Sequence, residues 1–162
     1  MAVWGGGNGA ETFGDGALYF PGSDTWKPLS LKGAPTARRL HTLVAAPVGD
    51  DEWLFVWGGM NSEEHALNSG AIYSVAHDSW YAMSIMDAPS PRHGHKAMWR
   101  DLDNRMVVWG GKNGSVTICS GMKFNPVINI WNRLSQAEIE ALQGEDSVCS
   151  QHKSEGTNGR KP

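Results

Sequence analysis

Residues 53–59 read Trp-Leu-Phe-Val-Trp-Gly-Gly, and the last four of them recur along the chain. Val-Trp-Gly-Gly also stands at 3–6 and at 108–111, so its tryptophan returns after intervals of 53 and 52 residues. A short apolar run that stops at a glycine pair is typical of a β-strand buried on both faces. The glycines then suit a reversal of the backbone in which φ becomes positive.

Further landmarks keep the same interval, which indicates an internal repeat. A glycine precedes an aromatic residue by three positions, and a tryptophan follows that aromatic residue after seven. In the first two units an arginine and a histidine stand 12 and 15 residues beyond this tryptophan. The repeated residues are Gly5, Gly6, Gly58, Gly59, Gly110, Gly111, Tyr19, Tyr73, Phe124, Trp26, Trp80, Trp131, Arg38, Arg92, His41 and His95.

Each complete unit is expected to form four short strands that pair into one antiparallel sheet. Apolar and aromatic runs alternate with glycine-rich or polar turns, such as the turn at 101–104. The predicted strands are 1–4, 16–21 and 25–29 in the first unit, 37–46, 53–57, 69–75 and 79–83 in the second, and 91–99, 105–109, 119–125 and 130–134 in the third.

In their common register, the glycine pair, the aromatic residue, the later tryptophan and the Arg-x-x-His pair resemble the kelch repeat. A kelch repeat has about 50 residues and builds one four-stranded blade of a β-propeller. The resemblance covers residues 1–134 and implies an all-β fold, namely part of a propeller similar to the central domain of galactose oxidase. The implied blades are an incomplete one at 1–30 and complete ones at 31–84 and 85–134.

Propellers usually close with about 4–8 blades, so about three blades imply an open arc. The chain is then part of a longer propeller, a half-ring that assembles with another chain, or a stable open arc. Apolar faces of the outer blades would be exposed in an isolated arc, which predicts self-association through the terminal blades.

The repeat stops before the C-terminus. Ser135 and Glu138 have the spacing of a capping box, so we expect a short helix at 135–144. The helix either covers part of the last blade or belongs to a loosely attached tail. Residues 145–162 are polar with few apolar side chains, and we expect them to be disordered.

Composition and charge exclude several partners and sites. The formal net charge is -3 and no cluster of Lys or Arg occurs, which argues against binding to nucleic acid. No apolar run reaches the roughly 18–20 residues that span a bilayer. Two cysteines, Cys119 and Cys149, are too few for a disulfide framework, and their spacing matches no metal motif.

The first ten residues do not have the basic and then apolar pattern of a signal peptide. The chain as given is therefore expected in the cytoplasm. If it belongs to an exported protein, the expected compartment is extracellular or periplasmic.

The repeated tryptophans Trp26, Trp80 and Trp131 have two interpretations. They could stack on a sugar or a peptide, but we favour packing between adjacent blades, because buried aromatic rings dominate core energetics.

Arg38 and Arg92 are expected on one rim of the propeller, where a guanidinium could hold a carboxylate or bind backbone carbonyls between blades. His41 and His95 are interpreted as hydrogen-bonded packing residues. His93 and His95 share a predicted strand face, but no third ligand has matching spacing, so no metal site is predicted.

We expect a non-catalytic module that binds a protein or a glycan through loops on one propeller face. Loops carry function more often than the strands that they join. The alternative is an enzyme of the galactose-oxidase or sugar-processing kind, although Cys119 has no visible partner for copper-oxidase chemistry; no cofactor is predicted. The candidate binding residues are Asn8, Arg38, Asn61, Glu63, Arg92, His93 and Asn113.

Overall fold

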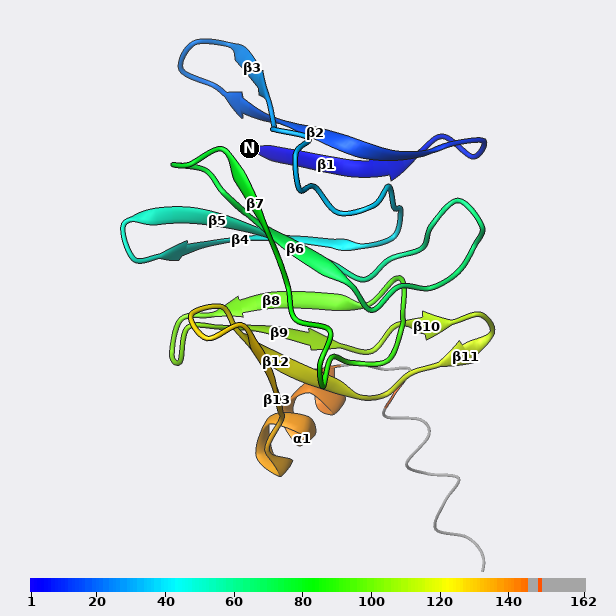
Figure 1. The fold of residues 1–162 in the computed structure, drawn as a ribbon. Coiled ribbons are helices and arrows are strands. Elements are labelled where there is room, and N and C mark those ends of the chain that lie inside the picture. Colours follow the sequence, from blue (N-terminus) through cyan, green and yellow to red (C-terminus); the bar gives the residue numbers. More distant parts are fainter. Residues whose placement is uncertain (146–148, 150–162) are drawn as a thin grey trace, which may run out of the picture.

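The structure, a computed structural model, describes residues 1–145 and Cys149 and contains three main antiparallel sheets, one above another (Figure 1). The sheets have the orders β1-β2-β3, β4-β5-β6-β7 and β13-β12-β9-β8, and a two-stranded ribbon, β10-β11, extends from the third. The all-β, partial kelch-type propeller that the repeats predict is confirmed, and the described residues form an open stack. The strands are β1 (Ala2–Gly7), β2 (Thr12–Phe20), β3 (Thr25–Pro28), β4 (Thr42–Val48), β5 (Asp51–Trp57), β6 (Gly70–Ser74), β7 (Ser79–Ala82), β8 (Lys96–Arg100), β9 (Arg105–Trp109), β10 (Lys112–Asn113), β11 (Val116–Thr117), β12 (Gly121–Asn125) and β13 (Ile130–Arg133).

The first strands of the two complete blades begin later than the sequence predicts. They begin at Thr42 and Lys96 rather than at 37 and 91. Leu40 and Gly94, with φ of 55° and 60°, adopt the left-handed conformation and interrupt the extended chain.

The residues ahead of these strands run along the preceding blade instead. The Gly6 N–H donates to the Arg38 carbonyl at 2.8 Å, and the Gly59 N–H donates to the Arg92 carbonyl at 2.9 Å. Each blade is therefore hydrogen-bonded to the glycine pair of the blade before it.

Alternate side chains of strand β5 face opposite neighbours. Leu54 and Val56 belong to the apolar cluster shared with the first sheet, and Phe55 and Trp57 to the cluster shared with the third. All four side chains are fully buried, as the apolar run predicts for a strand covered on both faces. Burial of these side chains holds the three sheets together.

Two of the repeated tryptophans also join neighbouring sheets by hydrogen bonds. The indole N–H of Trp80 in β7 donates to the Ser30 carbonyl at 2.7 Å, and that of Trp131 in β13 donates to the Ser84 carbonyl at 2.9 Å. Both rings are buried between blades. Packing between blades is therefore the correct interpretation of these two residues.

Trp26 does not follow the other two. Its side chain is 51% exposed, and it packs beside Tyr19 of its own sheet with ring centroids 5.0 Å apart. The described residues place no sheet on that side of β3, so packing of Trp26 between blades stays a prediction.

The glycine pairs allow two blades to approach closely. Gly58 and Gly59 have φ of 65° and 93°, in the region that L side chains rarely adopt. A Cβ on Gly58 would lie 2.6 Å from His95 Cε1 and 3.0 Å from the Arg92 carbonyl oxygen, both in the next blade. A Cβ on Gly59 would lie 2.7 Å from both the Arg39 carbonyl oxygen and the His41 Cβ, in the segment that leads into β4 of its own blade. Glycine is therefore required at both positions, because φ is positive there and because a Cβ would collide with neighbouring atoms.

Helix α1 (Gln136–Glu145) follows the last strand and begins with the predicted capping box. The Glu138 N–H donates to the Ser135 hydroxyl at 3.3 Å, and the Ser135 N–H donates to the Glu138 carboxylate at 2.6 Å. No helix among the described residues is long and apolar enough to cross a membrane.

A disulfide joins Cys119, just ahead of β12, to Cys149. The sequence does not predict this pairing, since two cysteines 30 residues apart give no pattern that indicates a disulfide. Disorder was predicted for 145–162, but Glu145 ends α1 and Cys149 is buried; 146–148 and 150–162 lie outside the described residues.

We predict that Gly59→Ala lowers the free energy of unfolding far more than Gly9→Ala. Both glycines have φ of 93°, so both variants carry the same conformational cost, about 1–2 kcal/mol. A Cβ at Gly9 meets nothing within 4 Å, whereas a Cβ at Gly59 meets the segment that leads into β4. Urea unfolding measures the difference, and equal losses would contradict the close approach of this segment.

Candidate functional site

Loops from all three blades meet at one edge of the stack, on the right of Figure 1. We call this the loop edge; it consists of 8–15, 31–41, 58–69, 92–95 and 112–118. Backbone bridges fix it: Arg39 and Met60 exchange two N–H···O bonds of 2.9 and 2.8 Å, and His93 and Lys112 exchange two of 2.9 Å. The loops are therefore held in place by the blades beneath them.

Arg38 and Arg92 lie at the loop edge but are only 1% exposed. Arg38 Nη1 donates to the carbonyls of Gly58 and Ser69 at 3.1 and 2.7 Å, and Arg92 makes the equivalent bonds in its own blade at 3.0 and 2.6 Å. Burial lowers the pKa of each guanidinium to about 10, so both remain charged at neutral pH.

The predicted ligand-binding role of these two arginines is therefore corrected. Their donors are engaged with backbone carbonyls, and their side chains are closed to solvent. Each guanidinium joins two strand ends of the same blade, not of adjacent blades as the alternative interpretation held.

His41 and His95 end two of the loop-edge segments and pack against Trp4 and Trp57 of the preceding blades. Nε2 of His95 lies 2.9 Å from the Thr42 hydroxyl of the preceding blade. Burial, followed by the charge of Arg92, lowers the pKa of His95 to about 3, and burial likewise lowers the pKa of His41. Both rings are consequently neutral packing residues near pH 7.

The candidate amides Asn8 and Asn61 stabilise turns at the loop edge. Asn8 Oδ1 accepts the N–H groups of Ala10 and Glu11, and Asn61 Oδ1 accepts those of Glu63 and His65. Glu63 and His65 are about three-quarters exposed. Asn113 is exposed on β10, and His93 is half-buried ahead of β8.

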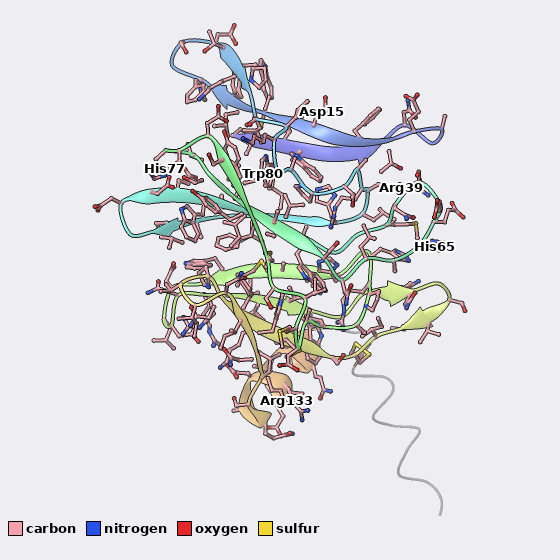
Figure 2. The ribbon with its side chains drawn as sticks, in the orientation of Figure 1. Asp15, Arg39, His65, His77, Trp80 and Arg133 are labelled. Atoms are coloured by element: carbon pink, nitrogen blue, oxygen red, sulfur yellow. A yellow bond between two sulfur atoms is a disulfide. The ribbon has the colours of Figure 1, made fainter. Side chains whose placement is uncertain are left out.

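Arg39 is a charged residue that the sequence analysis did not single out. Its guanidinium lies 3.0 Å from the Glu64 carboxylate and 3.7 Å from Met60 Sδ, so it links the segment before β4 to the long loop after β5. Figure 2 shows Arg39 and His65 at the same edge, away from His77 and Trp80. Because Arg38 and Arg39 are adjacent, the sequence alone does not indicate which of the two is buried.

An open groove of about 590 Å³ lies at this edge, between the start of β2 and the loops of the second blade. Phe13 and Leu31 are exposed apolar side chains in it, and Glu11 and Asp15 contribute exposed carboxylates. The remaining lining residues are Ala10, Thr12, Gly14 and Ser62.

The groove residues were not predicted from the sequence, although all of them fall between or beside the predicted strands. Leu31 and Asp15 are 16 positions apart and come together only because β3 returns beside β2. No sequence motif marks them.

Metal-binding side chains do not cluster in the part of the chain that the structure describes: it contains no group of three or more His, Cys, Asp or Glu placed to hold an ion. The predicted strand face with His93 and His95 is not formed, because Gly94 turns the chain between them. Cys119 is bonded to Cys149 and so is not free for a Cys–Tyr link.

Residues 1–154 match the model of the KLHDC2/KLHL20/DRC7 Kelch-repeats domain. The chain belongs to this kelch-repeat family. The match agrees with the stacked four-stranded sheets and with the repeat of glycine pairs and tryptophans. It does not bear on the likeness to galactose oxidase.

Several kelch proteins are similar to the chain. Kelch domain-containing protein 1 of Homo sapiens is 29% identical over 108 residues, which are 64% of this chain and 26% of the human protein. Kelch repeat-containing protein kel-10 of Caenorhabditis elegans is 27% identical over 138 residues, 83% of this chain and 22% of its own length. The chain thus spans about a quarter of these relatives.

We predict that His95→Gln makes stability less sensitive to acid. A neutral buried histidine with a lowered pKa favours the folded state above its unfolded pKa of about 6.5, and this stability is lost as the pH falls toward 3. Between pH 7 and pH 5 the wild type should lose about 2 kcal/mol more than the variant. Chemical unfolding at both pH values tests this; parallel losses would contradict a buried neutral His95.

Proposed function

We propose that this kelch-repeat chain is a non-catalytic module that binds a protein segment through the loop edge. The observation that best supports this proposal is the groove of about 590 Å³, in which two carboxylates lie beside two exposed apolar side chains. Family membership supports an interaction role. The finer statements, the ligand class and the face used, are proposals.

The chemistry of the groove favours a particular kind of segment. Glu11 and Asp15 attract Lys or Arg side chains, while Phe13 and Leu31 offer apolar contact area. A peptide that carries basic residues next to an apolar one satisfies both features. A glycan would use the aromatic ring and the hydroxyls but would gain little from the carboxylates.

Membership of a larger propeller also stays a prediction. It is compatible with the quarter of each relative that the chain spans. Additional blades would extend the loop edge and leave the groove on the first two blades unchanged.

The test uses peptides selected from a random library against the whole chain. We predict that selected peptides carry basic and apolar residues, and that Glu11→Lys with Asp15→Lys weakens their binding at least about tenfold, which is about 1.4 kcal/mol. Calorimetry measures the dissociation constants.

The matched control is Asp50→Lys with Asp101→Lys. It makes the same change in net charge in the exposed turns at the opposite edge of the stack, and it should leave affinity unchanged. Equal weakening by both double variants would contradict a site in the groove. Specific binding on a glycan array, in the absence of peptide binding, would favour the glycan instead.

A further inference from the structure

The interface between neighbouring blades contains a small unit that occurs twice. A serine at the end of each outer strand is bonded through both backbone groups to the next blade. The Ser30 N–H donates to Asp78 Oδ1 at 3.1 Å, and its carbonyl accepts the Trp80 indole N–H at 2.7 Å.

The second interface repeats this pattern. The Ser84 N–H donates to Asn129 Oδ1 at 2.8 Å, and its carbonyl accepts from Trp131 at 2.9 Å. In each interface, the blade that comes first in the chain provides three residues: the serine, the apolar residue just before it, and the tryptophan that precedes its glycine pair. We call these three residues the socket. The sockets are Trp4, Leu29 and Ser30 on the first blade, and Trp57, Met83 and Ser84 on the second.

The third blade has a socket of the same composition, and α1 occupies it. Its residues are Trp109, Leu134 and Ser135. The Ser135 N–H donates to the Glu138 carboxylate at 2.6 Å, in the manner of Ser30 and Ser84 with their acceptors.

Apolar side chains of α1 also take the place that a tryptophan of the next blade takes in the other two sockets. Ile139 and Leu142 pack against the buried cluster of Val107, Trp109 and Leu134, where the next blade would bring its tryptophan. The helix therefore supplies both the oxygen acceptor and the apolar contact that a following blade supplies elsewhere.

Charged contacts fix the helix in this position. The Glu138 carboxylate lies 2.5 Å from Arg100 and 2.9 Å from Lys123, both on strands of the third blade. Burial raises the pKa of Glu138, but the Ser135 N–H, Lys123 and Arg100 together lower it to about 2, so the carboxylate is ionised at neutral pH.

The other end of the stack carries the groups that such a socket receives. Trp26 and Asp24 occupy the repeat positions of Trp80 and Asp78, and Trp26 is 51% exposed. Asp24 already accepts the Tyr19 hydroxyl at 2.7 Å, the arrangement that Tyr73 and Asp78 adopt within an interface. Figure 1 shows β3 and α1 at opposite ends of the stack.

We propose that α1 is an end cap that occupies the socket of the third blade and thereby prevents a second copy of this chain from docking there through Trp26 and Asp24. The edge with Trp26 and Asp24, together with the socket that lies under α1, matches an interface that the chain forms twice internally. Such a head-to-tail contact joins different surfaces of two copies and so can extend beyond a dimer. The cap acts whether or not the loop edge binds a ligand.

The test releases the cap in the whole chain. Ile139→Asp with Leu142→Asp removes the apolar contacts of α1, and reducing buffer opens the disulfide between Cys119 and Cys149 so that the helix is not tethered. Light scattering after gel filtration should give a monomer for the oxidised wild type and at least twice that mass for the reduced variant.

Matched variants separate docking from unfolding. Ala137→Asp with Ala141→Asp adds the same charge to the exposed side of α1 and should remain monomeric in the same buffer. Adding Trp26→Ala to the released variant should restore the monomer, which would not happen if the assembly came from unfolded chains.

A milder variant tests the same proposal if the chain with the double substitution does not fold. Glu138→Ala removes the bond to Ser135 and both ion pairs but keeps the apolar residues, and it should associate at higher concentration in a manner that depends on Trp26. The proposal is overturned if a folded, released chain stays monomeric, or if its association persists with Trp26→Ala.

Discussion

The structure depends on the contact between a tryptophan of one blade and the serine carbonyl at the outer edge of the blade before it. An indole ring buried between sheets contributes a large apolar area, and its N–H requires a partner there. Trp80 and Trp131 find that partner in Ser30 and Ser84, so packing and hydrogen bonding act at the same point. The glycine pairs allow the blades to approach closely, since a side chain on Gly58 would collide with His95 of the next blade.

The loop edge follows from this packing. Once the blades are stacked, the turns after β1, β5 and β9 emerge at the same side, and the buried arginines tie strand ends together beneath them. The interior between the blades is apolar, whereas the loop edge carries many polar side chains. A groove with Glu11 and Asp15 next to Phe13 and Leu31 can form there without any change to the repeat.

Sequence periodicity predicted the blades well, because the glycine pairs and tryptophans carry strong local constraints. Local spacing, not the repeat, predicted the capping box of α1, which depends only on Ser135 and Glu138. Periodicity has limits elsewhere. It does not reveal that Trp26 is exposed here, since exposure depends on what lies beside β3 and not on the register of the repeat. The burial of Arg38, the disulfide of Cys119 and the groove all depend on residues brought together by folding, and no spacing rule marks them.

The most direct test of this account compares three alanine variants at equivalent positions, Trp26, Trp80 and Trp131, by urea unfolding. Trp80→Ala and Trp131→Ala should each lower the free energy of unfolding by about 3–5 kcal/mol, because both rings are buried between blades. Trp26→Ala should cost less than about 1 kcal/mol, the range of a cross-strand pair on an exposed face. Similar losses at all three positions would show that the tryptophans act within their own sheets and would contradict stacking of blades as the source of stability.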